Sequence, residues 1–542
     1  MLDPSCNDGA RAGGRTGMLK ESHGLAHPGA TQAEWSVLLP TPDDTVRFAA
    51  RIADFLRAGD LVTLSGDLGV GKTTFARALV RHLAGEPDLD VPSPTFTLMQ
   101  LYDAPAFPVV HADLYRIRSA AELAELGWDE ASDGALLIVE WAERIGDALP
   151  EDRLDVTLSI DPDAPETART ATVTGFGHFS ARIAQTEAVE SLLKAAGFAE
   201  AARTHLAGDA STRAYERLSR PDGRTALFMT SPPRADAPVV RFGKPYHEIA
   251  RLAGDIRPFL AMGAALRHQG VSAPEIYAAD AAAGIAVIED LGSEPFVDAD
   301  GPIAERYLEA VALLARLHAA ALPAAVPLGE GSYAIPPYDL DALQVEAELV
   351  IDWYAPHIGR IAIPASGRNA FMGICSRLFA EVAGRETTWT LRDYHSPNLI
   401  WLAEREGLAR VGVIDFQDCV LGHPAYDVAA LLQDARVTVP DALELKLLGA
   451  YAQLRASMDP AFDMASFVRA YAILGAQRAT KLLGIFARLD KRDGKPQYLA
   501  MLPRIEAYLV KGLAHPALAE LRGWYDTYMP RVLAPRPARE TD

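Results

Sequence analysis

Two stretches of this 542-residue sequence place chemically capable side chains at fixed spacings. The first is the run Gly66-Asp67-Leu68-Gly69-Val70-Gly71-Lys72-Thr73-Thr74. Because glycine has no Cβ, its backbone lets several N–H groups converge on phosphate oxygens. A lysine at this place reaches the β- and γ-phosphates, and the hydroxyl after it ligates Mg²⁺. The run predicts a nucleotide site made by Gly66, Gly69, Gly71, Lys72, Thr73 and Thr74, with Thr73 as a magnesium ligand.

The second stretch holds three residues suited to phosphoryl transfer. Asp393 and Asn398 are separated by four residues, which is the spacing of a protein-kinase catalytic loop, and Asp415 follows the apolar run 411–414. A carboxylate such as Asp393 can orient an acceptor hydroxyl and take its proton. Asn398 and Asp415 offer the hard oxygen ligands that Mg²⁺ prefers. We therefore predict Asp393 as the catalytic base, and Asn398 and Asp415 as metal ligands.

Neighbouring residues are expected to support this second group. We predict that Asp427 braces the catalytic loop by hydrogen bonds, that His395 orients it, and that His318 packs or hydrogen-bonds within a helix. Contacts to the acceptor are expected in a helical insert around residues 346–354.

The elements around the glycine run follow the order that a phosphate loop requires. Residues 60–65 form an apolar, strand-like run, and residues 75–83 continue as a helix whose positive dipole end would face the phosphates. A further helix is predicted over residues 43–60 from its apolar periodicity.

Acidic residues end two more apolar runs in the first half. Asp113 follows residues 109–112, where a second magnesium anchor would lie, and Glu140 follows residues 135–139. Carboxyl ends of strands border the ligand crevice in open α/β sheets, so we predict functional roles for both acids. Two alternating runs, 154–160 and 169–174, predict a hairpin that closes this domain.

The smaller part of the second half shows weaker signals. Residues 208–217 read as a small-residue hairpin, so Ser211 and Arg213 are predicted to contact nucleotide phosphates. Residues 285–292 suit a hinge between two lobes, and residues 303–535 are expected to be largely helical. The strand-like run 224–230 has no lysine where kinases carry one, and Met229 stands near that place.

Composition excludes several classes of protein. Hydrophobic residues make up 49% and charged residues 23%, which argues against a wholly disordered chain. No apolar run approaches the roughly 20 residues that span a membrane. The net charge of −20 argues against direct nucleic-acid binding. The scattered Cys6, Cys375 and Cys419 favour neither a zinc site nor disulfides, and they favour a cytoplasmic location. Residues 1–32 are expected to be a disordered leader or to follow a misassigned start codon.

Residues 34–160 resemble the TsaE family, the bacterial ATPases that serve threonylcarbamoyladenosine modification of tRNA. The matching stretches are GDLGVGKTTFARAL, SPTFTLMQLY, HADLYRI, ELAELGWDE and VEWAERI, in this order. The resemblance implies an ATPase that binds the threonylcarbamoylation complex, a transferase with its companion subunit, and resets it by hydrolysing ATP. It also implies that Asp113 holds Mg²⁺, Glu140 acts in hydrolysis, Thr95 lies in a nucleotide-sensing loop and Trp141 packs beside the nucleotide or the partner.

Residues 195–530 resemble the aminoglycoside-phosphotransferase superfamily of small-molecule kinases. Within it, the sequence is most similar to the anomeric kinases of N-acetylmuramate and N-acetylglucosamine that serve cell-wall recycling. The supporting stretches are GDASTRAYER, VIEDLG, LRDYHSPNLIWL, GVIDFQDCVLGHPAYDVAALLQDAR and AQRATKLLGIFARL. The resemblance implies the same roles for Asp393, Asn398 and Asp415, with ATP and Mg²⁺ as cofactors.

Together these features predict an α/β P-loop NTPase domain over residues 33–184, followed by an α+β, bilobal, kinase-like domain over residues 185–535. The expected function is bifunctional: an ATPase supporting tRNA threonylcarbamoylation and a kinase of an amino sugar, with no membrane involvement. Two alternatives stay open for the second domain. It could act on another small alcohol, such as an aminoglycoside, choline or homoserine, or it could be a catalytically weak scaffold.

Overall fold

The chain folds into two compact units, 1–188 and 189–542, and each is described by itself. In a computed structural model, the described residues are 32–533. Within that span the description omits 54–55, 118–121, 123–127, 129–131, 133, 147–148, 161, 163, 166, 207–212 and 235–236. The predicted leader therefore lies almost wholly outside the described residues, and so does most of the stretch ELAELGWDE. No helix among the described residues is long and apolar enough to cross a membrane.

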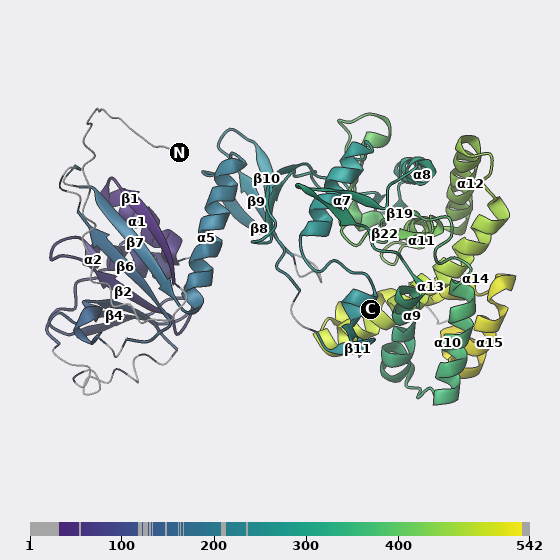
Figure 1. The fold of residues 1–542 in the computed structure, drawn as a ribbon. Helices are drawn as coiled ribbons and strands as arrows, with labels where there is room; N and C mark the ends of the chain where they lie inside the picture. Colours follow the sequence, from purple (N-terminus) through teal and green to yellow (C-terminus); the bar gives the residue numbers. More distant parts are fainter. Residues whose placement is uncertain are drawn as a thin grey trace, which may run out of the picture. The chain divides into compact units, whose positions relative to one another are not determined.

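The first unit is built on one seven-stranded sheet (Figure 1). In sheet order its strands are β1 (Gln32–Leu39), β7 (Arg169–Phe176), β6 (Arg153–Ser159), β2 (Leu61–Ser65), β5 (Leu136–Glu140), β4 (Val109–Asp113) and β3 (Met99–Tyr102). Strands β6, β2, β5 and β4 run parallel, and the other three pair antiparallel to their neighbours. The sheet confirms the predicted α/β class and the predicted hairpin of β6 and β7.

Helices cover the sheet and bury its apolar side chains. Helix α1 (Pro42–Ala53) contributes Phe48, and α2 (Lys72–Ala84) contributes Phe75, to a core that also takes in Phe179 of α5 (His178–Ala195). The predicted helix over 43–60 is too long, because residues 56–60 form a turn. Gly59 has a left-handed φ of 82°, and the Asp60 carboxylate accepts a hydrogen bond from the Arg57 N–H at 2.8 Å.

A five-stranded antiparallel sheet forms the smaller part of the second unit. Its strands, in sheet order, are β13 (Ile276–Asp280), β14 (Ile285–Ile288), β10 (Thr225–Thr230), β9 (Ala214–Ser219) and β8 (Ala202–Leu206). Helix α7 (Arg257–His268) follows in the chain between β10 and β13, together with the short hairpin β11–β12 (Val239–Arg241 and Lys244–Pro245) and the single turn α6 (Tyr246–Ile249).

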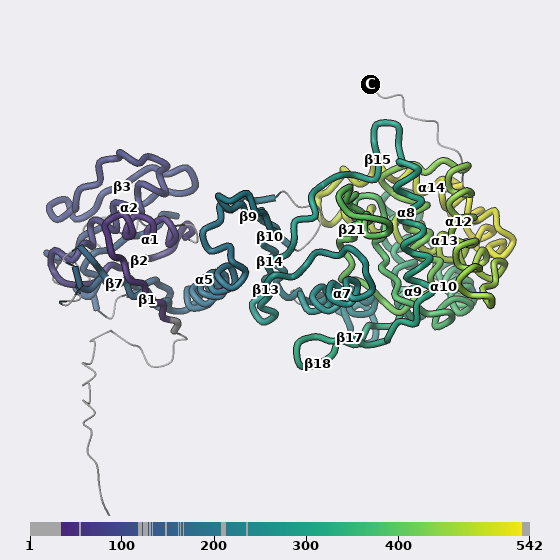
Figure 2. The backbone as a smooth tube through the Cα atoms, turned by 90° about the horizontal axis from the view of Figure 1, so that it is seen from above, coloured from purple at the N-terminus to yellow at the C-terminus, as the bar shows by residue number. Residues whose placement is uncertain are grey.

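The larger part of the second unit is mainly helical, as predicted (Figure 2). Its helices are α8 (Ala304–Ala319), α9 (Leu340–Leu349), a π-helix (Val350–Gly359), α10 (Ala365–Phe379), α11 (Ala425–Leu432), α12 (Asp441–Met458), α13 (Met464–Asp493), α14 (Leu502–Gly512), α15 (Ala519–Tyr528) and α16 (Pro530–Leu533). Short strand pairs interrupt them: β15–β16 (Val297–Asp298, Gly301–Pro302), β17–β18 (Ala325–Leu328, Gly331–Ala334), β19–β22 (Thr388–Thr390, Val420–Gly422) and β20–β21 (Leu399–Trp401, Val411–Val413).

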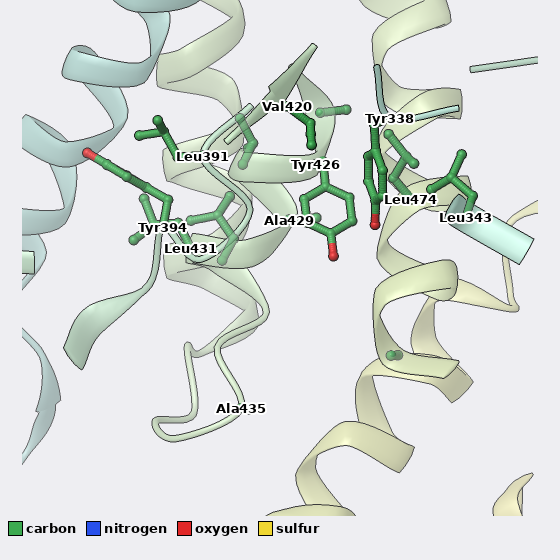
Figure 3. Close-up of a cluster of buried hydrophobic side chains, with 14 of the residues drawn as sticks. Tyr338, Leu343, Leu391, Tyr394, Val420, Tyr426, Ala429, Leu431, Ala435 and Leu474 are labelled. Carbon is green, nitrogen blue, oxygen red and sulfur yellow. The ribbon is translucent and has the colours of Figure 1, made fainter. Parts of the chain in front are cut away.

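An apolar core supports the segment between β19 and β20. Leu391 and Tyr394 of this segment are buried, and Figure 3 shows them with side chains of β22 and α11. The rings of Tyr338 and Tyr426 meet edge to face, with centroids 5.2 Å apart. This packing fixes the backbone on which Asp393 and Asn398 stand.

Candidate active sites

The phosphate loop of the first unit connects β2 to α2, as the sequence predicts. Gly66, Gly69 and Gly71 have φ values of 129°, 79° and 114°, in the region that favours glycine. A Cβ at Gly66 would lie 2.3 Å from the backbone oxygen of Leu158, so no larger residue fits there without moving β6. The residues of the loop thus adopt the turn that exposes N–H groups at the start of α2.

Lys72 lies at the start of α2 and bends back over the loop. Its Nζ donates hydrogen bonds to the backbone oxygens of Gly66 at 2.7 Å and Asp67 at 3.0 Å, and it lies 3.8 Å from the centroid of the Trp141 ring. Burial lowers the pKa of Lys72, while Glu140 and neighbouring acids oppose that shift. The ammonium group is thus held beside the loop, and Trp141 packs on it.

The two predicted acids of the first unit meet at the carboxyl edge of the sheet. Asp113 ends β4 and Glu140 ends β5, and the two residues are direct partners in the parallel pairing. Glu140 accepts a hydrogen bond from the hydroxyl of Thr73 at 3.1 Å and contacts Nε2 of His111 at 3.0 Å. The structure therefore brings Thr73, at the phosphate loop, into contact with the acid expected to act in hydrolysis.

Asp113 is held by hydroxyl groups from the loop before β3. Its Oδ2 accepts hydrogen bonds from Ser93 at 2.9 Å and Thr95 at 3.0 Å, and its Oδ1 accepts one from the backbone N–H of Tyr115 at 2.9 Å. Thr95 thus joins the loop to the acid of β4. The sequence analysis did not predict His111, which contacts Glu140. His111 lies two positions before Asp113 in β4, so both side chains point to the same face of the sheet, and this spacing could have indicated it.

In the second unit, the three residues predicted for phosphoryl transfer lie together. The Asn398 side-chain amide donates to the backbone oxygen of Asp393 at 2.9 Å and to Oδ2 of Asp415 at 3.3 Å. Asp415 stands in a left-handed conformation, with a φ of 62°, two residues after the end of β21. One amide group therefore links the expected base to the expected metal ligand.

A predicted phosphate-binding arginine reaches the same place. Arg213 donates to Oδ1 of Asp415 and, at 2.5 Å, to the side-chain oxygen of Gln417. Burial would raise the pKa of Asp415, but Arg213 outweighs it and holds that pKa below its ordinary value. Ser211 lies outside the described residues.

A cavity of about 320 Å³ lies between the small sheet and Asp415. It is lined by the predicted hinge residues 289–292, by Leu227 of β10, by Ile414, and by Asn398 and Asp415. Met229 does not line this cavity; it is fully buried in the apolar core. Arg213 and Arg217 are the basic residues of its lining.

A second space, a cleft of about 410 Å³, also has Arg213, Asn398 and Asp415 in its lining. Asp393 lines the cleft but not the cavity, whereas Asn398 and Asp415, the expected metal ligands, border both spaces. The arrangement suits a nucleotide in the cavity and an acceptor in the cleft.

Residues 346–354, which are predicted to contact the acceptor, do not line this cleft. Glu346 is fully buried beneath the catalytic loop instead. The wall of the cleft comes from one face of α13, through residues spaced three or four apart: Arg478, Lys481, Leu482, Ile485, Phe486 and Leu489. That helical spacing is present in the sequence, but it looks like an ordinary core face.

Buried ion pairs and hydrogen bonds hold the catalytic loop. Asp427 is fully buried, and its carboxylate accepts hydrogen bonds from the backbone N–H groups of Leu391 at 2.7 Å and Arg392 at 2.8 Å, as predicted. The Arg392 guanidinium pairs with Glu346, which also lies 2.9 Å from Nζ of Lys481.

Of the two histidines predicted to support the loop, His318 is buried and His395 is partly buried. Nδ1 of His318 lies 2.9 Å from the Tyr451 hydroxyl, which agrees with a packing and hydrogen-bonding role. The backbone N–H of His395 donates to the Asp393 carbonyl at 3.1 Å, and burial lowers the pKa of His395.

Comparison with known families agrees with both halves of the fold. Residues 39–170 match the family "Threonylcarbamoyl adenosine biosynthesis protein TsaE", and residues 203–461 match the "Phosphotransferase enzyme family". The first part is 41% identical over 126 residues to the tRNA threonylcarbamoyladenosine biosynthesis protein TsaE of Rickettsia bellii, covering 23% of this chain and 87% of that protein.

The second part is similar to kinases of amino sugars. It is 40% identical over 352 residues to the N-acetylmuramate/N-acetylglucosamine kinase of Caulobacter vibrioides, covering 63% of this chain and 95% of that protein. It is 32% identical over 324 residues to the kinase of the same name from Pseudomonas aeruginosa, covering 58% of this chain and 84% of that protein.

Proposed function

Because this chain belongs to the TsaE family in its first part, and to the phosphotransferase enzyme family and its N-acetylmuramate/N-acetylglucosamine kinases in its second, we propose that it is a bifunctional enzyme. Its first unit is an ATPase that supports N6-threonylcarbamoyladenosine modification of tRNA. Its second unit is an ATP-dependent kinase that phosphorylates the anomeric hydroxyl of N-acetylmuramate or N-acetylglucosamine for cell-wall recycling.

The ATPase proposal is supported by the contact between the phosphate loop and Glu140. Gly66, Gly69, Gly71, Lys72, Thr73 and Thr74 form the nucleotide site in this proposal. In this proposal Glu140, which contacts Thr73, orients the water that attacks the γ-phosphate, and Thr95 senses the nucleotide through its hydrogen bond to Asp113. The partner is the threonylcarbamoylation complex, and direct contact with tRNA is not needed in a chain of net charge −20.

One observation carries the kinase proposal: the Asn398 amide joins Asp393 to Asp415 where the nucleotide cavity meets the cleft. Asp393 accepts the proton of the sugar hydroxyl as its oxygen attacks the γ-phosphorus of ATP. A new oxygen–phosphorus bond forms, the bond from that phosphorus to the β,γ-bridging oxygen breaks, and ADP leaves. Arg213 contacts the phosphates, in place of the lysine that the small sheet lacks.

The residues at both sites fit Mg²⁺. The ligands proposed are the Thr73 hydroxyl and Asp113 in the first unit, and Asn398 and Asp415 in the second; all are hard oxygen donors. When bound, Mg²⁺ neutralises charge on the phosphates of ATP. The buried free thiols of Cys375 and Cys419 support a reducing location, which we take to be the cytoplasm.

The kinase proposal is tested by ³¹P NMR of the full-length protein with MgATP and single acceptors. We expect a new anomeric phosphate signal with N-acetylmuramate or N-acetylglucosamine, and its loss in Asp393→Asn. A signal with kanamycin, choline or homoserine would overturn the sugar assignment. Silence with every acceptor would favour a catalytically weak scaffold.

The ATPase proposal is tested separately in the same full-length chain. Lys72→Ala should abolish threonylcarbamoylation of tRNA, measured with the purified modification complex, while the sugar kinase activity stays at the level of the unaltered protein. Loss of both activities would show that the two units do not work independently.

A further inference from the structure

The cleft that we assign to the acceptor has an uneven distribution of charge. Besides Asp393 and Asp415, its lining acids are Asp255, Asp418 and Asp434, and each of these three has a partner inside the protein. Asp255 pairs with Arg257, Asp418 accepts the Ala253 N–H at 2.6 Å, and Asp434 accepts the Ser396 N–H at 2.9 Å. These acids are therefore committed to holding the walls of the cleft.

The basic residues of the cleft differ in what they contact. Lys481 pairs with the buried Glu346 at 2.9 Å, so its charge is balanced inside the protein. Arg234, on an exposed segment, uses its Nε to donate to the Ala253 carbonyl at 2.7 Å. Arg436 is exposed and also lines the cleft.

Arg478 is the exception among these cations. It is 5% exposed, lines the cleft from α13, and donates one hydrogen bond, from Nη1 to the backbone oxygen of Gln433 at 3.0 Å. Within the described part of the chain, no carboxylate lies within ion-pair distance of its guanidinium. A buried charge without a countercharge is costly, and an anionic ligand in the cleft would remove that cost.

We propose that Arg478 binds the carboxylate of the acceptor, which makes the site selective for N-acetylmuramate over N-acetylglucosamine. This inference rests on the proposed kinase function. The two sugars differ by the lactyl ether of N-acetylmuramate, which carries a carboxylate that N-acetylglucosamine lacks. A guanidinium matches a carboxylate with two parallel hydrogen bonds, and Arg478 has only one of its nitrogens engaged.

The test compares three acceptors in a steady-state assay of ADP release by the full-length protein. They are N-acetylmuramate, its neutral primary amide and N-acetylglucosamine. In the unaltered protein, kcat/KM for N-acetylmuramate should exceed that for the amide by about 30-fold or more, the range for a buried charged pair that loses one partner. This comparison needs no variant.

Arg478→Gln should raise KM for N-acetylmuramate by a similar factor with little change in kcat, because the contact lies away from the reacting atoms. In Arg478→Gln, KM and kcat for the amide and for N-acetylglucosamine should stay within about threefold of those of the unaltered protein. Arg478→Lys, which keeps the charge, should recover part of the selectivity. The matched control is Arg469→Gln on the same helix, where the arginine is exposed and pairs with Glu381, and it should leave all three acceptors unchanged.

Three results would overturn the inference, and they distinguish its own failure from failure of the proposed function. If the unaltered protein uses N-acetylmuramate and its amide equally well, or if Arg478→Gln impairs all acceptors alike, Arg478 does not read the carboxylate while the kinase function stands. If the unaltered protein phosphorylates none of the three sugars, the proposed function fails and the inference fails with it.

Discussion

Removal of the Asp427 carboxylate should release the catalytic loop of the kinase unit. The side chain is fully buried, and its two oxygens accept the backbone N–H groups of Leu391 and Arg392. Arg392 has a left-handed φ of 68°, a conformation that persists only where surrounding contacts impose it. Each hydrogen bond to a charged group contributes about 1.5–3 kcal/mol, so Asp427→Ala should destabilise the loop by roughly 3–6 kcal/mol.

Asp427→Asn provides a graded test of that figure. Its amide oxygen can still accept one N–H, but its NH₂ group faces the other, so about half of the stabilisation should remain. The exposed Asp441, which pairs with Lys511, is the matched control for loss of a carboxylate.

The assay is hydrogen exchange of the peptide that contains residues 388–398, followed by mass spectrometry. The amides of this peptide should exchange about a hundredfold or more faster in Asp427→Ala than in the unaltered protein. The increase should be smaller in Asp427→Asn, and Asp441→Asn should exchange at the unaltered rate. The kcat of sugar phosphorylation should fall in the same order. Exchange in Asp427→Ala within about threefold of the unaltered protein would refute the bracing role.

Three further changes have calculable outcomes. Burial lowers the pKa of His423 from 6.5 to about 4. As the pH falls, this histidine is therefore protonated in the unfolded chain at a higher pH than in the folded protein. As the pH falls from 6.5 to 4, up to about 3 kcal/mol of stability of the second unit should be lost. Urea unfolding should show a flatter pH profile in His423→Gln; an unchanged profile would contradict this origin. Gly66→Ala places a Cβ 2.3 Å from the Leu158 oxygen and should remove one of two MgATP sites in calorimetry; retention of both sites would contradict this reasoning. Arg213→Met should raise KM for ATP in the kinase assay by about 10-fold or more, and Arg213→Lys by less; equal values for both variants would argue against a phosphate contact.

The residues that lie together at each candidate site could be predicted because their signals are local in the sequence. The phosphate loop occupies consecutive residues, so the glycines, Lys72 and Thr73 identify one another. Asp393 and Asn398 lie on one short loop, and Asp113, Glu140 and Asp415 each follow an apolar strand. Strand ends are readable from alternation and apolar runs, and parallel strands bring their ends together.

Partners brought together by tertiary packing could not be predicted in the same way. Strand β1 pairs with β7 in a register that sets Trp35 opposite Val173, and no local pattern links two segments so far apart. The α13 wall of the cleft has the same difficulty. Its residues repeat every three or four positions, which is also the pattern of a helix buried in the core. Only the tertiary structure, which puts α13 and Asp393 around the same cleft, distinguishes a cleft wall from a core helix.

The small sheet shows how a missing residue type can be replaced from another element. In strand β10, Leu227 lines the nucleotide cavity and Met229 is buried in the apolar core; neither can carry charge. Arg213, directly before β9, brings a guanidinium to Asp415 from the end of the strand instead. Because Asp415 is also the expected metal ligand, the arginine and Mg²⁺ compete for its oxygens. We expect nucleotide binding to move Arg213 from this carboxylate to the phosphates, which exchanges one anion for another at nearly constant charge.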